Sequence, residues 1–399
     1  MKFSKRVEQL QPSMTIEVMK QAARLKEQGE DVIDLGPGEP DFPTPDNVKE
    51  AGIAAIRANF TKYTDSSGIL PLRKEVASKY KREWALDISP DEVLISCGAK
   101  HSIFNLCMTL LDAGDEVIIP APYWVSFPEI AAMAGAKPVI VQTREQDGFV
   151  LDPDEMARAI TPRTKLLLIN SPNNPTGAVI PEAQVREIVA IARKHDIFVA
   201  FDEVYEKLIY SDSGAFSVLA CRAEAPDRII VLNAVSKAYS MTGWRLGYTV
   251  GPKALVQAMG KLQSQTTSNP VSISQKAAIE ALGGPQESVA LMREEYRKRR
   301  DYVLSVMHTM EGVRCARPEG AFYVFPNVQA FLGRPGMSDS LQFTSHLLSE
   351  AKIATVAGSG FGAEGYIRIS YATSMENLQK AMQRMKECLA GLGHFLPTT

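Results

Sequence analysis

A chain of 399 residues, of which 45% are hydrophobic, can bury a sizeable core. Its length predicts two or three domain-sized units, or one large domain with a smaller partner. A net charge of −2 argues against nucleic acid or a membrane surface as partners, since both attract basic proteins. The five cysteines are scattered without a CxxC spacing and the five histidines are dispersed, so we expect a reducing compartment and no metal site.

No targeting or membrane-spanning segment is predicted. The first residues, MKFSKRVEQLQPS, carry charge but lack the apolar stretch of a signal peptide. No apolar run reaches the ~18 residues that a bilayer-spanning helix needs. We therefore expect a soluble, cytoplasmic protein.

The N-terminal part predicts helices joined by irregular loops. Residues 13–29 form an amphipathic helical pattern that ends at Gly29, a residue suited to cap a helix. A short strand then leads into GPGEPDFPTP, a loop that either approaches a ligand through its backbone or merely connects two elements. Tyr63 follows in a polar loop, where its phenol either reaches a phosphate or packs on the surface.

Residues 92–120 predict a strand, a tight Cys-Gly-Ala loop, a helix and a second strand. This order indicates a right-handed βαβ unit and hence a parallel sheet. Gly98 and Ala99 open the helix, whose free N–H groups and positive dipole end attract a phosphate. Many such turns bind nothing, so the loop by itself is weak evidence.

Aromatic and polar side chains follow the ends of the predicted strands, where open α/β sheets bind their ligands. Trp124 either stacks on a flat ring or belongs to the core. Asn174 is held between prolines in SPNNPTG. Asp202 ends the strand IFVAFD, with Tyr205 three residues further on. A buried carboxylate at a strand end needs a cationic or N–H partner, which a ligand or a structural arginine could provide.

The stretch VLNAVSKAYSMTGWRLG contains a lysine just beyond another buried strand. Most lysines in such loops are simply solvated. If Lys237 is desolvated, however, its pKa falls and part of it becomes a free amine, the form that attacks an aldehyde. Arg245 adds a permanent cation suited to bidentate phosphate binding. An amine beside a phosphate clamp suggests pyridoxal 5′-phosphate (PLP).

The pattern changes from about Gly283, where a charged helix is followed by short strands and helices that suggest a separate α+β unit. Arg368 falls within the strand GYIRIS and is either a solubilising edge residue or a bidentate carboxylate clamp. GSGFGA at Gly358–Ala363 fits a dinucleotide fingerprint but does not join a strand to a helix in a βαβ unit, so we discount it. We expect domains over 46–282 and 283–399, with 1–45 joining the smaller one.

The candidate groups at the strand ends fit one ligand. Arg245 and the helix start at Gly98–Lys100 would hold the phosphate of PLP. Trp124 would stack on the ring, and Asp202 would keep the ring nitrogen protonated, so that the ring accepts electrons. Asn174 and Tyr205 would bond the ring oxygen, and Lys237 would bond to the cofactor and then move a proton at the substrate α-carbon. With Arg368 orienting the substrate carboxylate, these roles describe transamination.

NSPNNPTG, FDEVYEKL, SKAYSMTGWRLGY and GYIRIS, in this order and spacing, resemble the class I aminotransferases of PLP fold type I. The resemblance covers essentially the whole chain, and the combination is far more specific than any one motif. GAKHSIFNL, PAPYWVSFPE and MTGWRLGY are most similar to the bacterial and plant aspartate/prephenate subgroup. The resemblance implies a large α/β domain, in which helices enclose a mostly parallel seven-stranded sheet, and a smaller α+β domain.

The resemblance also implies a homodimer with shared active sites, in which Tyr63 reaches the PLP phosphate of the partner subunit. It implies that Ser236 contacts the cofactor. The residues implied to contact the substrate are Gly38, Trp124, Asn174 and Arg368.

For a dicarboxylic substrate, the subgroup implies a distal carboxylate site at Lys100 and Thr15. His101 stands where the family often has glutamine, and SMTIEV around Thr15 also departs from its pattern. We therefore expect an aspartate aminotransferase, with glutamate, 2-oxoglutarate and oxaloacetate as the other substrates and prephenate as a further acceptor that gives arogenate. The alternatives are aromatic or alanine-type donors, a C–S lyase, or a PLP-sensing regulator, although the regulator would need a DNA-binding extension.

Overall fold

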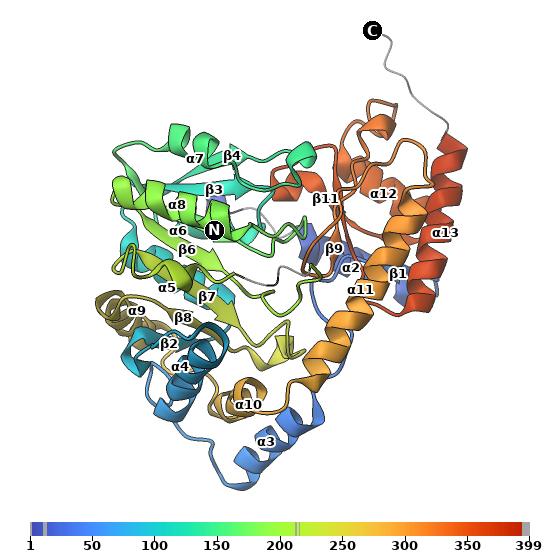
Figure 1. Cartoon of the computed structure of the whole chain (residues 1–399). Helices are drawn as coiled ribbons and strands as arrows, with labels where there is room; N and C mark the ends of the chain where they lie inside the picture. The colour runs from blue at the N-terminus through green and yellow to red at the C-terminus, as the bar shows by residue number, and fades with distance from the viewer. Residues whose placement is uncertain (1, 11–13, 212–213, 215, 393–399) are drawn as a thin grey trace.

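The computed structural model describes residues 2–10, 14–211, 214 and 216–392 (Figure 1). Its largest element is a seven-stranded sheet, as the resemblance implied, and the strands lie in the order β2-β8-β7-β6-β5-β3-β4. β8 pairs antiparallel with both neighbours, and the other pairs are parallel. The strands are β2 (Val93–Ser96), β3 (Glu116–Ala121), β4 (Lys137–Gln142), β5 (Thr164–Asn170), β6 (Phe198–Asp202), β7 (Ile229–Ala234) and β8 (Gly247–Val250).

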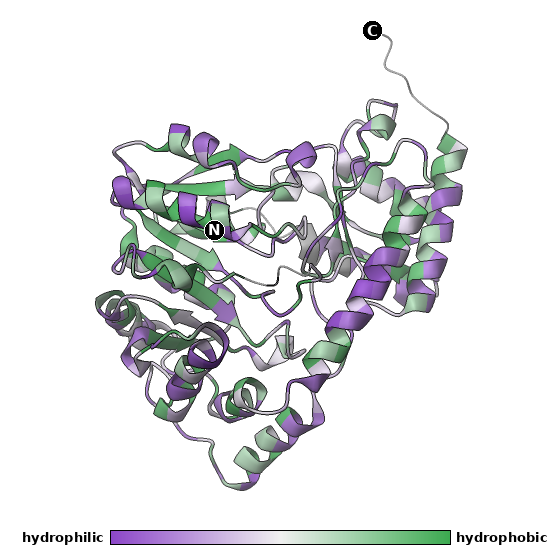
Figure 2. Ribbon diagram, in the orientation of Figure 1, coloured by the Kyte–Doolittle hydropathy of each residue, from purple (hydrophilic) through white to green (hydrophobic). Residues whose placement is uncertain are grey.

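Helices cover both faces of this sheet, and this explains why its central strands read as continuous apolar runs. Successive side chains of a strand point to opposite faces. Ile118 and Val231 belong to one buried cluster and their neighbours Ile119 and Leu232 to the other. Apolar strands accordingly lie between helices in Figure 2. The helices of this part are α3 (Asp46–Arg57), α4 (Leu70–Trp84), α5 (Ala99–Leu110), α6 (Ser126–Met133), α7 (Pro153–Ala159), α8 (Glu182–Lys194), α9 (Lys253–Thr266) and α10 (Ser272–Gly283).

The two strands that flank α5 are not neighbours. β2 and β3 belong to the same sheet and run in the same direction, but β8, β7, β6 and β5 lie between them. The pattern predicted the parallel direction correctly, yet local sequence carries no information on which later strands insert between the two. Both strands still end at one edge of the sheet, and this keeps the Gly98 loop near the other candidate groups.

The N- and C-terminal parts form a second, smaller unit around a separate apolar cluster (Figure 1). β11 (Val356–Ala357), β12 (Ile367–Ser370) and β9 (Tyr323–Val324) form an antiparallel sheet, and β1 (Ile33–Asp34) pairs with β10 (Ile353–Ala354). The domain boundaries at 45/46 and 282/283 stay a prediction. The helices here are α2 (Met14–Glu27), α11 (Glu287–Met307), α12 (Ser340–Glu350) and α13 (Met375–Leu392), and the short helix α1 (Lys5–Gln9) precedes α2 in the chain.

Two exclusions follow from the described part of the chain. The GSGFGA segment joins the antiparallel strands β11 and β12 through a short 3-10 turn, so it is no dinucleotide loop. No helix there is long and apolar enough to cross a membrane, and no group of three or more His, Cys, Asp or Glu side chains could hold a metal ion.

Candidate active site

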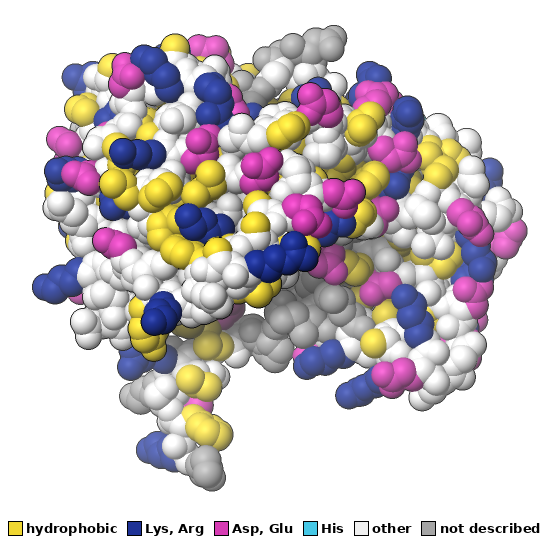
Figure 3. All heavy atoms as spheres, turned by 90° about the horizontal axis from the view of Figure 1, so that it is seen from below, with side chains coloured by type: hydrophobic (Ala, Val, Ile, Leu, Met, Phe, Trp, Pro, Cys, Tyr) yellow, Lys and Arg dark blue, Asp and Glu magenta, His cyan; other side chains and the backbone are white. Residues whose placement is uncertain are grey.

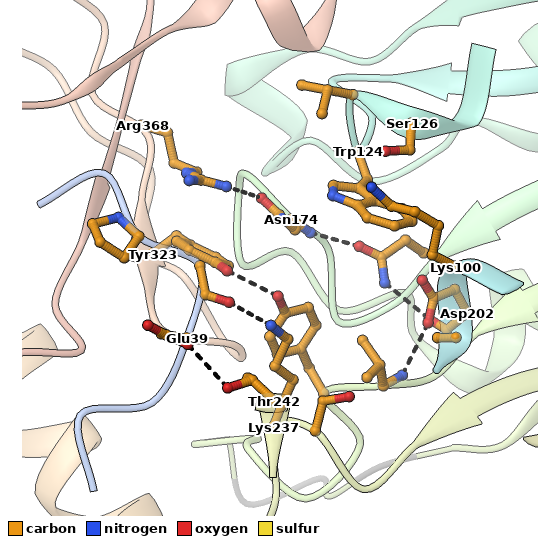
Figure 4. A pocket seen from close by; sticks show the side chains of 18 of the residues that line it. Glu39, Lys100, Trp124, Ser126, Asn174, Asp202, Lys237, Thr242, Tyr323 and Arg368 are labelled. Atoms are coloured by element: carbon orange, nitrogen blue, oxygen red, sulfur yellow. Dashed lines mark hydrogen bonds between the residues drawn. The ribbon is translucent and has the colours of Figure 1, made fainter. Parts of the chain in front are cut away.

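A cavity of about 320 Å³ lies at the carboxyl-terminal edge of the large sheet, and loops of the smaller unit close its other side (Figure 4). Most of the predicted site residues meet there. Those that line the cavity are Gly38, Ala99, Lys100, Trp124, Asn174, Asp202, Tyr205, Ser236, Lys237, Arg245 and Arg368.

Lys237 follows β7 and points into the cavity, where its Nζ donates a hydrogen bond to the carbonyl oxygen of Gly38. Burial and, after it, the positive charge of Arg368 lower the pKa of Lys237 to about 8, against the opposing negative charges of Glu39 and Asp202. A minor fraction of the side chain is therefore a neutral amine near neutral pH, as the sequence predicted.

Asp202 ends β6 at the floor of the cavity and is 4% exposed. It accepts a hydrogen bond from the N–H of Val204 at 3.2 Å, and no described arginine or lysine forms an ion pair with it. The alternative of a structural arginine is thus excluded among the described residues. Burial raises the pKa of Asp202 to about 7, and a cationic ring nitrogen would restore its charge.

Arg245 and Gly98 form a cradle at the start of α5. A Cβ at Gly98 would lie 2.8 Å from Nη2 of Arg245, and the φ of Gly98 is +89°, so a side chain here would be both crowded and strained. Lys100 also lies at this mouth of the cavity, 4.9 Å from the ring centre of Trp124. Partial burial and the charge of Arg245 lower the pKa of Lys100. Two cations with no described carboxylate between them favour an anion at this place.

Arg368 lies on β12 at the opposite side of the cavity and is only 2% exposed, so it is not a solubilising edge residue. Its Nη1 donates to Oδ1 of Asn174 at 2.9 Å, and its Nη2 donates to the carbonyl oxygen of Gly36. Its Nε has no hydrogen-bond partner in the described structure. A buried guanidinium that lacks a carboxylate partner is suited to bind one from a substrate.

Tyr63 is not among the residues that line the cavity, and the position of the Thr15 side chain is not described. Tyr63 lies in the loop between α3 and α4 and is 89% exposed. Thr15 belongs to α2, and its side chain lies outside the part that the structure describes. The resemblance implied a role for Tyr63 at the partner's phosphate and one for Thr15 at the distal carboxylate, and both roles stay predictions.

Sequence reasoning missed several cavity residues. Tyr323 on β9 places its hydroxyl 2.9 Å from that of Tyr205. Thr242 donates from Oγ1 to Glu39 at 2.9 Å across the entrance. Tyr323 sits in GAFYVF, which reads only as an apolar strand, and Glu39 sits in a loop read for its glycines and prolines. The only sign of a site residue in this stretch was the hydroxyl of Tyr323 itself, a polar group within an otherwise apolar run.

The described groups fit PLP. A partly deprotonated amine, an unpaired buried carboxylate, an indole face and a glycine-arginine cradle match its aldehyde, ring nitrogen, ring and phosphate. An α/β fold with this site defines a PLP-dependent enzyme that acts on amino acids.

Comparison with known proteins gives the family. Residues 30–385 match the family model "Aminotransferase class I and II". The chain is 45% identical to the aspartate/prephenate aminotransferase of Nitrosomonas europaea, over 98% of this chain and 100% of that protein. It is 44% identical to the aspartate aminotransferase of Geobacillus stearothermophilus, over 96% and 98%. The aspartate aminotransferase of Thermus thermophilus with maleate superposes with a TM-score of 0.92 at 42% identity, over 97% and 100% of the two chains.

The chain therefore belongs to the class I and II aminotransferases, and its cofactor is PLP.

Proposed function

We propose that this aminotransferase moves the amino group of aspartate or glutamate to 2-oxoglutarate or oxaloacetate, and that prephenate is a further acceptor. The observation that carries the proposal is the pair of cationic sites on opposite sides of Lys237. Arg368 lies on one side, and Lys100 lies at the mouth on the other. A substrate with two carboxylates can bind both. The maleate named with the Thermus thermophilus structure is a dicarboxylate, and both named relatives act on aspartate.

The residues of the chain divide the work of such a reaction. Arg368 binds the substrate α-carboxylate and so fixes the direction of the Cα–H bond. When bound, PLP supplies an electron sink for the charge released at Cα. Lys237 takes the proton from Cα as a base and then returns it as an acid to complete a 1,3-proton shift, which its pKa of about 8 allows near neutral pH.

The remaining cavity residues hold the cofactor in place. Asp202 keeps the ring nitrogen protonated, and Asn174 and Tyr205 bond the ring oxygen. Trp124 covers the ring. The phosphate is proposed to bind Ser236, Arg245 and the free N–H groups of the helix start at Gly98, Ala99 and Lys100, which leaves the side chain of Lys100 for the substrate.

We also propose a homodimer in which Tyr63 completes the partner's phosphate site. Lys100 and Arg245 are exposed in the single chain, so this end of the cavity is open. The largest exposed apolar side chains include Ile56, Tyr63 and Val271, from α3 and the segments beside it. Figure 3 views the molecule from the α3 end, where apolar side chains lie among basic ones. Sedimentation should give the mass of two chains, and a fully active monomer would exclude the proposal.

Lys100→Met is expected to lower kcat/KM for aspartate and glutamate by about 10- to 100-fold, because one hydrogen bond to a charged group is lost. The value for alanine should change less than about threefold by the same reasoning. Lys253 also begins a helix but pairs with Asp91 at the surface, so Lys253→Met is the matched control. Equal losses for aspartate and alanine would place Lys100 at the phosphate and remove it from substrate selection.

The activity itself is tested with a panel of amino donors, each with 2-oxoglutarate. Aspartate should give oxaloacetate much faster than alanine or phenylalanine give their oxo acids. Prephenate with glutamate should give arogenate. Release of pyruvate and ammonia from a cysteine derivative without any acceptor would instead identify a C–S lyase.

A further inference from the structure

Tyr323 lies between Arg368, which is the proposed carboxylate clamp, and Tyr205, whose phenol is proposed to bond the cofactor (Figure 4). It is fully buried on β9, whose neighbour β12 carries Arg368. Its hydroxyl lies 2.9 Å from that of Tyr205, and the guanidinium carbon of Arg368 lies 4.6 Å from its ring centre. Tyr323, a side chain of the smaller unit, thus contacts both Arg368 of the proposed substrate site and Tyr205 of the proposed cofactor site.

The position of the Tyr323 hydroxyl is closely fixed. A Cβ at Gly38 would approach its oxygen to 2.8 Å, so the absence of a side chain at Gly38 leaves room for this phenol. Its ring packs edge-on against that of Tyr205, with centroids 5.9 Å apart. These contacts leave the phenol little freedom to bond elsewhere.

The two phenols have one hydroxyl hydrogen each, so only one of them donates in their mutual bond. If Tyr205 donates to the ring oxygen of the cofactor, it can accept from Tyr323. A chain then runs from Tyr323 to Tyr205 and on to the cofactor. A hydroxyl that accepts one hydrogen bond becomes a better donor in the next.

We propose that Tyr323 is a positioning residue with two separable effects: its hydroxyl strengthens the hydrogen bond from Tyr205 to the cofactor, and its ring supports Arg368 in the carboxylate clamp. The proposal rests on the proposed function, because it assigns Tyr205 and Arg368 their roles there. The hydroxyl effect acts on the bound cofactor alone. The ring effect acts on substrate binding.

Two variants separate these effects. Tyr323→Phe keeps the ring and removes the hydroxyl, so Tyr205 becomes a weaker donor and the ring oxygen of PLP becomes more basic. The pH at which the visible absorbance of the bound cofactor changes should rise by about 0.5 to 1 unit, while KM for aspartate changes less than about twofold. Tyr323→Leu also removes the ring and should raise that KM by at least about tenfold, because Arg368 loses its cation–π support and its packing.

The test is a titration of absorbance against pH for a double-mutant cycle of purified, PLP-bound proteins. The cycle comprises the unmodified enzyme, Tyr323→Phe, Tyr205→Phe and the double variant. If Tyr323 acts through Tyr205, Tyr323→Phe produces no further shift in the Tyr205→Phe background. Tyr366→Phe is the matched control, since Tyr366 lies nearby outside the cavity and its hydroxyl bonds Glu145.

The proposal would be overturned if Tyr323→Phe left the pH of the absorbance change where it is in the unmodified enzyme. It would also be overturned if Tyr323→Phe still shifted that pH in the Tyr205→Phe background. The absorbance titration needs no turnover, so its result stands apart from the donor panel. Failure of aspartate in that panel would refute the proposed function, whereas a normal panel with no shift would refute only the role of Tyr323.

Discussion

Lys237→Ala is expected to lower kcat for aspartate by at least about 10⁴-fold, the upper range for loss of a positioned general base. The variant should still bind PLP, because the Gly98–Arg245 cradle and Asp202 remain. Its visible absorbance should resemble that of the free aldehyde, since the amine that bonds to the cofactor is gone. The expectation rests on the burial of Lys237, which helps to lower its pKa to about 8 and so suits it to the proposed roles of nucleophile and base.

The measurement is steady-state transamination together with the spectrum of the reconstituted protein. Lys253→Ala, on the surface at the start of α9, is the control and should behave as the unmodified enzyme. Lys100 is the other lysine that lines the cavity, and its exposed position makes it a poor substitute base. If Lys237→Ala kept turnover within tenfold and an unchanged spectrum, the assignment of the catalytic amine would be wrong.

Lys79→Met is expected to lower the free energy of unfolding by about 3–5 kcal/mol, because it leaves a buried carboxylate without its partner. Lys79 on α4 is 1% exposed, and its Nζ lies 2.8 Å from Oε1 of Glu206 and 3.2 Å from Oε2 of Glu83. Burial alone would lower the pKa of Lys79, but the negative charge of Glu206 and its other neighbours holds that pKa well above its usual value. Glu83 keeps a second partner in Lys207 at 2.6 Å, so Glu206 bears the loss.

Urea unfolding of the cofactor-bound variants measures this effect. The double variant Lys79→Met/Glu206→Gln should recover much of the loss, because the uncompensated charge is removed as well. Lys81 lies on the same helix as Lys79 and forms a surface pair with Asp87, so Lys81→Met should cost less than about 1 kcal/mol. A similarly small effect for Lys79→Met would show that the buried pair contributes nothing to stability.

The meeting of the candidate groups of the large sheet in one cavity could be predicted because each group stands at or just after the end of a strand. Asp202, Asn174 and Lys237 stand at or just after the ends of apolar runs that form parallel strands. The carboxyl ends of parallel strands meet at one edge of the sheet. No knowledge of strand order was needed for that inference. The prediction that these groups meet at one edge therefore holds even though β2 and β3 are far apart in the sheet.

The residues that escaped prediction depend on contacts between distant segments. Tyr323 reaches Tyr205 only because β9 pairs with β12, with Tyr323 opposite Ser370. Lys79 occupies a helix position that reads as a solvated lysine, and its burial depends on the turn that carries Glu206. Neither contact leaves a local pattern in the sequence.

The most direct test of the proposed function is one half-reaction. Purified enzyme carrying PLP is mixed with aspartate in the absence of any oxo acid, and both the absorbance and the products are followed. The visible band is expected to disappear with release of one oxaloacetate per bound PLP, and 2-oxoglutarate is expected to restore the band with formation of one glutamate. A band that persists, or ammonia in place of an amino group retained on the enzyme, would contradict it.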